Sequence, residues 1–343
     1  MDGSNSVIGR GSVRVRTAWP SWTLVLVGML LCLAGGSVLF ADTAAEDWWM
    51  DSQTDVVDGA YGRSSSSGVL ASAEWLNWRA HRGGTDFASF VDPIWLTPAT
   101  LESADYDRDN GVRAGLGYRF DSGWDVRWNY TYFQTSAAGA VDQSANPGLV
   151  LIATRSYFDL VVDSVAAQTR LDYGVHDLEV GRQLVWDNDA ELRLFGGFRW
   201  AKIDQTENQG YTYQDNFGNW IDGTVDGRNR LEAYGIRLGA ETQWTTRSGL
   251  GLFGRLAGSV LLGDFDVRQR EVDQVQGTIL DFGDTHYRAV PVLDAAAGVS
   301  WTYHNWQLAG GYEMTTWFNM GEIERASYDL ILDGFFLRLS YAY

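Results

Sequence analysis

Residues 111–134, GVRAGLGYRFDSGWDVRWNYTYFQ, decide the fold class of this 343-residue chain. In the first half of the stretch, apolar residues such as Val112 and Tyr118 alternate with Gly or Arg. After the turn residues 121–123, aromatic residues such as Trp124 and Trp128 alternate with Asp, Arg and Asn. Strict period-two alternation is typical of a β-strand with one apolar and one polar face. The stretch therefore predicts an antiparallel hairpin.

The same alternation recurs along the chain and predicts ten strands. They are 69–80, 111–120, 124–134, 167–186, 191–202, 230–245, 250–263, 287–303, 306–318 and 328–343. Short connections (121–123, 187–190, 246–249 and 304–305) alternate with longer ones (81–110, 135–166, 203–229, 264–286 and 319–327). Outer-membrane barrels combine short periplasmic turns with longer external loops. We therefore expect an all-β, up-and-down antiparallel transmembrane barrel of about ten strands, with twelve as an alternative.

One predicted strand, 167–186, changes its apolar parity along its length. Tyr173 and Val175 lie at odd positions, whereas Leu178 and the apolar residues after it lie at even positions. A β-bulge inserts one residue and shifts the parity of everything that follows. We therefore predict a bulge at residues 176–177, which would keep one face of the strand apolar throughout.

Composition excludes several classes of protein. The formal net charge is −18, and aromatic residues make up 14% of the chain. Disordered chains are poor in aromatic residues, so the aromatic content argues against disorder. A nucleic-acid-binding protein needs a basic face, so the negative charge argues against that class. Beyond the N-terminus, no apolar run approaches the roughly 20 residues of a membrane-spanning helix. A water-soluble β-sandwich would explain the two-faced strands but not the alternation of connection lengths.

The N-terminus predicts export. Arg10, Arg14 and Arg16 precede the apolar run 24–33, and small residues follow up to Ala41. This order is typical of a signal peptide. We therefore predict a signal peptide at 1–41, a periplasmic leader at 42–67 and an outer-membrane barrel at 68–343. The only cysteine of the chain lies inside the predicted signal peptide, so the mature protein would form no disulfide.

Aromatic residues mark the ends of the predicted strands. Phe120, Trp124, Trp244 and Trp306 flank the short turns. Aromatic side chains at both membrane interfaces form the girdles of outer-membrane barrels. This distribution supports the predicted position in the outer membrane of a Gram-negative envelope.

The last strand carries a second pattern. Its alternating apolar row ends on the final residue of the chain, and the row consists of Phe335, Leu337, Leu339, Tyr341 and Tyr343. We interpret this row as the signal that the barrel assembly machinery recognises. Outer-membrane lipid and that machinery are therefore the predicted partners, and a homo-oligomer is left open.

Strand parity also predicts the residues that face the lumen. They are Arg113, Arg119, Asp125, Arg127, Arg170, Asp172, Glu179, Arg193, Arg199, Arg237, Glu241, Arg255, Asp294, Glu313 and Arg338. Arginine pairs with carboxylates through a planar, bidentate fork. Two interpretations follow. The lumen is either a narrow polar conduit for small hydrophilic solutes or ions, or an interior largely filled by Arg–carboxylate networks.

The sequence predicts no enzyme, no cofactor and no metal site. Ten-stranded surface proteases use Asp and His near the outer rim, and His81 and His286 fall in predicted long connections. No nucleophile motif accompanies them. A surface protease is therefore the third hypothesis, after a pore and a plugged structural or adhesive barrel.

Several ordered blocks carry a family resemblance. They include LFGGFRWAKID at 194–204, LFGRLAGS at 252–259 and DGFFLRL at 333–339. Over residues 68–343 the chain resembles the Legionella-type major outer membrane protein family. The resemblance implies a pore-forming, porin-like outer-membrane barrel that takes part in ion transport. The absence of cysteine from the mature chain means that the disulfide-linked oligomers of the type proteins are not implied here.

Overall fold

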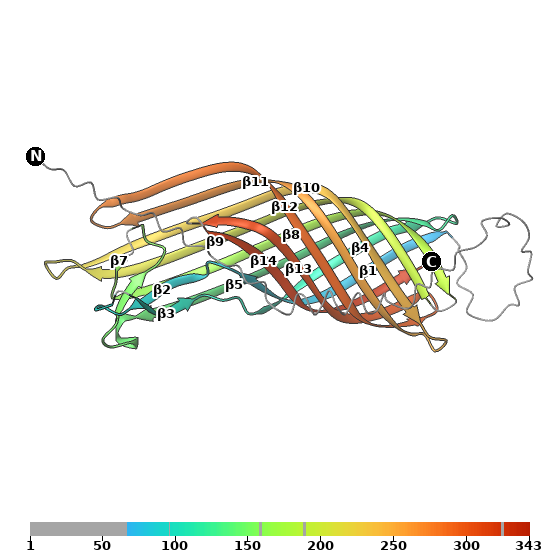
Figure 1. Cartoon of the computed structure of the whole chain (residues 1–343), viewed down its shortest axis with the longest axis horizontal. Coiled ribbons are helices and arrows are strands. Elements are labelled where there is room, and N and C mark those ends of the chain that lie inside the picture. The colour runs from blue at the N-terminus through green and yellow to red at the C-terminus, as the bar shows by residue number, and fades with distance from the viewer. Residues whose placement is uncertain (1–66, 96, 158–159, 188–189, 324–325) are drawn as a thin grey trace, which may run out of the picture. The chain divides into compact units, whose positions relative to one another are not determined.

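The computed structural model describes residues 67–343 except 96, 158–159, 188–189 and 324–325. Ten strands form one closed barrel, which confirms the predicted all-β fold (Figure 1). In barrel order they are β1 Gly68–Arg82, β14 Ala326–Ala342, β13 Trp306–Ile323, β12 Gly277–Tyr303, β11 Leu250–Asp273, β10 Trp220–Thr245, β9 Ala190–Gln214, β8 Ser164–Asp187, β5 Trp124–Asp142 and β4 Arg108–Arg119. The predicted signal peptide, and the leader apart from its last residue, lie outside the described residues.

The barrel has two distinct ends. The short turns 120–123, 246–249 and 304–305 lie at the end that we call lower, together with the C-terminus. There the Tyr343 amide donates to the Val69 carbonyl at 3.0 Å. The opposite end is called upper. No helix in the described part of the chain is long and apolar enough to cross a membrane.

The strands extend much further upward than the sequence predicts. The expected connection 203–229 is reduced to residues 215–219, and 264–286 is reduced to 274–276. The prediction of long loops there was wrong because the upper strand segments carry polar residues that break the simple alternation. β10 contains 26 residues. At roughly 3.3 Å per residue it is far longer than the 9–11 residues that cross a bilayer.

A second, smaller sheet lies at the upper end. Its order is β3 Pro98–Ser103, β2 Asp86–Val91, β6 Val150–Ala153 and β7 Leu160–Val161, and the short 3-10 helix η1 Gln143–Ala145 precedes β6. Buried residues of this sheet, among them Phe87, Phe90 and Leu151, pack in one cluster with Val165 and Tyr211 of the barrel wall. The predicted long connections 81–110 and 135–166 therefore contain folded strands.

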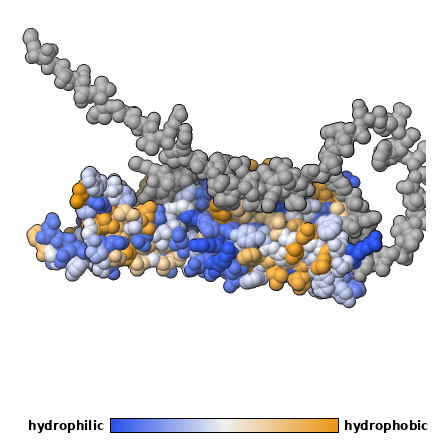
Figure 2. Space-filling view, turned by 60° about the horizontal axis from the view of Figure 1, so that its bottom comes forward, coloured by the Kyte–Doolittle hydropathy of each residue, from blue (hydrophilic) through white to orange (hydrophobic). Residues whose placement is uncertain are grey.

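The outer surface of the barrel changes from apolar to polar along the strands, as β10 shows. On β10 the lower outward residues are Tyr234, Ile236 and Leu238, all more than half exposed, whereas Arg228 and Arg230 lie above them. On the face shown in Figure 2, hydrophobic residues gather over the lower part and a hydrophilic zone lies next to them. An exposed apolar band of this kind is the lipid-facing belt of a membrane barrel. We call it the lipid belt.

The predicted bulge at residues 176–177 is wrong. β8 pairs without interruption through this point, since His176 opposes Tyr130 on one side and Trp200 on the other. The odd-numbered Tyr173 and Val175 are buried inside the barrel, and Leu178 lies outside. The strand keeps its register, and the polarity of its inner face changes instead.

Candidate functional site in the barrel lumen

A belt of paired charges fills the lower lumen. Each of the ten barrel strands contributes at least one charged side chain to it. Among the described residues its members are Glu74, Arg113, Asp125, Arg127, Asp177, Glu179, Arg193, Arg199, Arg237, Glu241, Arg255, Asp294, Glu313 and Arg338. This set holds equal numbers of arginines and carboxylates. We call it the charge belt.

Glu179 is the centre of the larger network in this belt. Its carboxylate accepts hydrogen bonds from Arg193 at 3.0 Å, Arg237 at 3.2 Å and Arg255 at 2.5 Å. Glu179 is only 1% exposed. Removing a carboxylate from water costs several kcal/mol, and close, well-oriented pairing is needed to offset that loss. Three guanidinium groups around one carboxylate meet this requirement.

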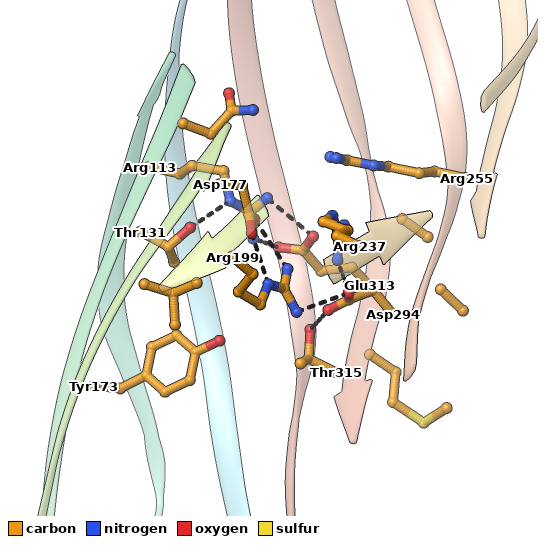
Figure 3. A pocket seen from close by; sticks show the side chains of 15 residues that line it. Arg113, Thr131, Tyr173, Asp177, Arg199, Arg237, Arg255, Asp294, Glu313 and Thr315 are labelled. Carbon is orange, nitrogen blue, oxygen red and sulfur yellow. Dashed lines mark hydrogen bonds and ion pairs between the residues drawn. The ribbon is translucent and has the colours of Figure 1, made fainter. Parts of the chain in front are cut away.

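Asp294 forms the second junction of the network (Figure 3). Its Oδ2 accepts from Arg199 at 3.0 Å and is also bonded to Arg237, and its Oδ1 accepts from Thr315 at 2.8 Å. Arg199 also donates to both oxygens of Asp177 at 2.6 and 2.9 Å. Arginine side chains thus connect β8, β9, β10 and β12 across the lumen, and the Thr315 hydroxyl adds β13.

A smaller network lies on the opposite wall. Arg113 donates to Glu74 at 2.7 Å, to Glu313 at 3.0 Å and to the Thr131 hydroxyl at 2.9 Å. The indole Nε1 of Trp78 also donates to Glu313, at 3.1 Å. Since Trp78 belongs to the apolar cluster above, this bond joins the charge belt to that cluster.

An apolar layer closes the lumen above the charge belt. It is formed by side chains that are at most 3% exposed, among them Trp78, Tyr173, Leu231, Phe265 and Trp317. Tyr173 packs edge-on against both Trp78 and Trp317, at centroid distances of 6.1 and 5.9 Å. A cavity of about 30 Å³ remains between this layer and the charge belt. A space of that size holds about one or two water molecules.

A third layer occupies the upper lumen. Arg82 is ion-paired with Glu207, and its Nη1 donates to Gln205 at 2.8 Å, while Arg155 approaches Glu207 at 3.0 Å. Higher up, the Tyr211 hydroxyl donates to Glu271 at 2.9 Å. Burial and this hydrogen bond raise the pKa of the Tyr211 hydroxyl, so that it stays protonated as the donor. In the upper lumen two arginines therefore share the carboxylate of Glu207, and Glu271 is hydrogen-bonded to a tyrosine.

A comparison with known sequences gives the family. The sequence profile described as "Legionella pneumophila major outer membrane protein precursor" matches residues 66–343. The chain belongs to this family. No curated protein sequence matches the chain. Family membership and the barrel fold support a location in the outer membrane.

Three solved structures show a weak similarity to this chain. The outer membrane protease OmpT of Escherichia coli matches with a TM-score of 0.47 and 11% identity, over 80% of this chain and 97% of that chain. The attachment invasion locus protein Ail of Yersinia pestis matches with a TM-score of 0.26 and 11% identity, over 81% of this chain and 99% of that chain. The transport unit of the autotransporter AIDA-I from Escherichia coli matches with a TM-score of 0.30 and 9% identity, over 84% of this chain and 94% of that chain.

The structure places the predicted lumen residues in three ways. Arg119 lies on the inner face of β4 near its lower end. Arg170 and Asp172 lie on the outer face of β8, where they pair with each other at 2.9 Å, so their predicted inward position was wrong. The assumed bulge caused this error. The charge belt contains the other predicted residues: Arg113, Asp125, Arg127, Glu179, Arg193, Arg199, Arg237, Glu241, Arg255, Asp294, Glu313 and Arg338.

Sequence reasoning missed two members of the charge belt. Asp177 was assigned to the bulge, although an unbroken parity from Glu179 would have placed it inside. Glu74 shares the inner face of β1 with Leu76 and Trp78. Because these two neighbours are apolar, the sequence pattern did not indicate that this face points into the lumen. Both omissions arise from the change of lumen polarity along one strand.

The histidines considered for catalysis lie on strands rather than in long connections. His81 is on β1, where its Nε2 lies 2.9 Å from Asp333 Oδ1. His286 is on β12, where its Nδ1 lies 3.1 Å from Asp284. Among the described residues, no group of three or more His, Cys, Asp or Glu side chains is arranged to hold a metal ion.

Proposed function

We propose that this protein is a closed outer-membrane barrel that supports a projecting upper half and passes no solutes in its folded state. The observation that carries the proposal is the apolar layer above the charge belt. Leu231, Phe265 and Trp317 are each at most 1% exposed at a level where an open channel would be lined by water. This packing favours the plugged structural or adhesive alternative.

The porin-like alternative requires a different lumen. A conduit for hydrophilic solutes needs polar walls that exchange their partners with the solute. In the charge belt each guanidinium is instead held by carboxylates on other strands, as Arg237 is by Glu179 and Asp294. A solute would have to separate these pairs and then displace the apolar layer. Both the charge belt and the apolar layer would therefore oppose permeation by this route.

Conductance in planar bilayers distinguishes the two functions. The refolded barrel should insert without producing current steps, while a known porin in the same bilayers serves as the positive control. Folding of the inserted sample is checked by its heat-modifiable gel mobility. Regular current steps from correctly folded protein would overturn the closed-barrel proposal and favour the porin-like function.

We further propose that the outward row of the last strand directs assembly. Phe335, Leu337 and Leu339 lie exposed on the outer face of β14, beside the seam with β1. Replacing Tyr343 by Ser should lower the amount of folded protein in the outer membrane, whereas the refolding yield in detergent should stay unchanged. Equal loss in both measurements would indicate a structural role only.

The absence of enzymatic activity remains a prediction. Peptide cleavage by the wild type and by a His81→Ala, His286→Ala double variant provides the test. Cleavage that disappears in the double variant would contradict the prediction, and equal background in both proteins would support it.

A further inference from the structure

Three turns at the upper end share one arrangement, in which an aspartate fixes the backbone and an apolar residue two positions later is exposed. In the first, Asp92 Oδ1 accepts from the amides of Ile94 at 2.7 Å and Trp95 at 3.1 Å. Ile94 and Trp95 are 79% and 75% exposed. We call these three turns the apolar tips.

The second apolar tip joins β9 to β10. Asp215 Oδ1 accepts from the amides of Phe217 at 2.9 Å and Asn219 at 2.8 Å, and its Oδ2 accepts from the Asn219 side chain at 3.0 Å. Gly218 supplies the positive φ of 83° that the turn needs. Hydrogen bonds from Asn219 lower the pKa of Asp215, because they favour the ionised carboxylate that accepts them. Phe217 is 91% exposed.

The third apolar tip joins β11 to β12. Asp273 Oδ1 accepts from the amides of Val275 at 2.7 Å and Gln276 at 2.9 Å, while its Oδ2 accepts from the Tyr213 hydroxyl at 2.9 Å. Asp273 itself is buried, whereas Val275 projects and is 68% exposed. This tip adjoins the second one, since the Gln274 amide donates to the Asp222 carbonyl near the start of β10.

The apolar tips stand out against their surroundings. The outer face below them is charged, and pairs such as Arg228–Asp204 cover it. The tip segments 92–95, 215–220 and 273–277 contain no Lys or Arg. Isolated apolar side chains on a surface are common, but these are carried by turns whose backbone is fixed by hydrogen bonds to an aspartate. Rigid presentation reduces the ordering entropy lost on contact with a partner.

We propose that the apolar tips insert into the interfacial region of a facing lipid bilayer with zwitterionic headgroups. Three separate turns would need three matching pockets on a protein, whereas a fluid bilayer accepts apolar side chains at any lateral spacing once they reach its surface. Aromatic side chains such as Trp95 and Trp220 favour the membrane interface. The tip segments themselves contain no Lys or Arg, so they offer no cation of their own to anionic headgroups.

The inference rests on the proposed function, because in a closed barrel we expect the projecting upper end to make the functional contacts. Outer-membrane barrels carry their larger extensions on the extracellular side. The upper strand segments and the small sheet extend beyond the lipid belt, so we place the apolar tips on the side that points away from the cell. The lipid belt anchors the protein in its own membrane, and the tips meet a second one. The inference and the conductance result are independent, since tip insertion requires nothing of the lumen.

Flotation tests the inference on the full chain reconstituted in lipid nanodiscs. The discs are mixed with protein-free vesicles of phosphatidylcholine, and the fraction that floats with the vesicles is measured. Replacing Ile94, Trp95, Phe217 and Val275 together by Ser should abolish flotation, and Phe217→Ser alone should lower the partition coefficient by about tenfold. Leu101→Ser, on the exposed strand β3, is the matched control and should change nothing.

Three outcomes would overturn the inference. Wild-type discs that do not float with phosphatidylcholine vesicles would leave a protein partner as the remaining explanation of the exposed side chains. Loss of flotation in Leu101→Ser equal to that in Phe217→Ser would show general stickiness. Stronger flotation with phosphatidylglycerol vesicles would show that charge, and not the apolar tips, controls binding. A conducting barrel that still floats would overturn the closed-barrel proposal alone.

Discussion

The lower and upper halves of this barrel are built from the same strands with opposite polarity. In the lower half, Leu238 of β10 faces lipid and Arg237 faces the charge belt. In the upper half, Arg230 faces outward and Leu231 is buried inside. The lower half thus meets lipid outside, and the upper half resembles a water-soluble barrel with an apolar core. The difference shows that burial on a strand depends on the surrounding medium at each height.

The largest effect should come from a charge placed in the apolar layer. Leu261, fully buried on β11, would become an unpaired carboxylate in Leu261→Asp. We expect a loss of at least about 4 kcal/mol in the free energy of unfolding, because a carboxylate buried among apolar side chains loses its hydration. Urea unfolding of the refolded barrel in micelles measures this loss.

The control for this variant lies two residues away on the same face. Ser259 contacts Arg237 at 3.4 Å within the charge belt, so Ser259→Asp should be far less destabilising. Equal losses in the two variants would remove the distinction between the layers.

The second effect concerns the charge belt itself. Arg237→Met leaves Glu179 and Asp294 with one guanidinium fewer each, and we expect a loss of about 3–5 kcal/mol. Arg268→Met removes an exposed pair with Asp266 and should change stability by less than about 0.5 kcal/mol. Denaturant midpoints of both variants against the wild type provide the measurement. A neutral Arg237→Met would show that the belt is dispensable.

The third effect tests the outer surface. Leu238→Arg places a cation near the middle of the lipid belt and should cost about 2–4 kcal/mol for refolding into vesicles. Thr224→Arg, on the same face of β10 but above the belt, should be neutral. If the two variants refold equally well, the lipid belt has been placed at the wrong height.

The smallest effect concerns the link between layers. Trp78→Phe removes the donor to Glu313 but keeps most of the apolar volume, so a loss of about 1.5 kcal/mol is expected. Trp75→Phe is the control, because its indole donates to Asn110 on the exposed outer face. Thermal unfolding followed by gel mobility compares the two. A larger loss in the Trp75 variant would contradict the assignment of inner and outer faces.

The sequence predicts the lower half well because its outer face is apolar and its inner face polar over many consecutive positions. The ten strands and the short turns follow directly from that alternation. The upper half was misread for a physical reason. Between Gln205 and Tyr211 both faces of β9 are largely polar, so period two disappears although the strand continues.

The lumen was predicted only in its lower part. Parity places Arg193 and Glu179 inside, where the structure has them. The same rule fails at Arg170, because apolar residues were assumed to face lipid everywhere and Leu171 in fact faces a core. Single-sequence patterning cannot locate the height at which lipid gives way to water. The folded elements β2, β3, β6 and β7 are too short to show any period.

The seam between β1 and β14 has a consequence for the order of biogenesis. Leu70 pairs with Ala342, so the first and last strands meet across almost the whole chain. Contacts this distant in sequence slow folding, because a long loop must close before they form. Until β1 and β14 pair with each other, each presents an unpaired strand edge. Closing this one seam therefore removes both exposed edges at once.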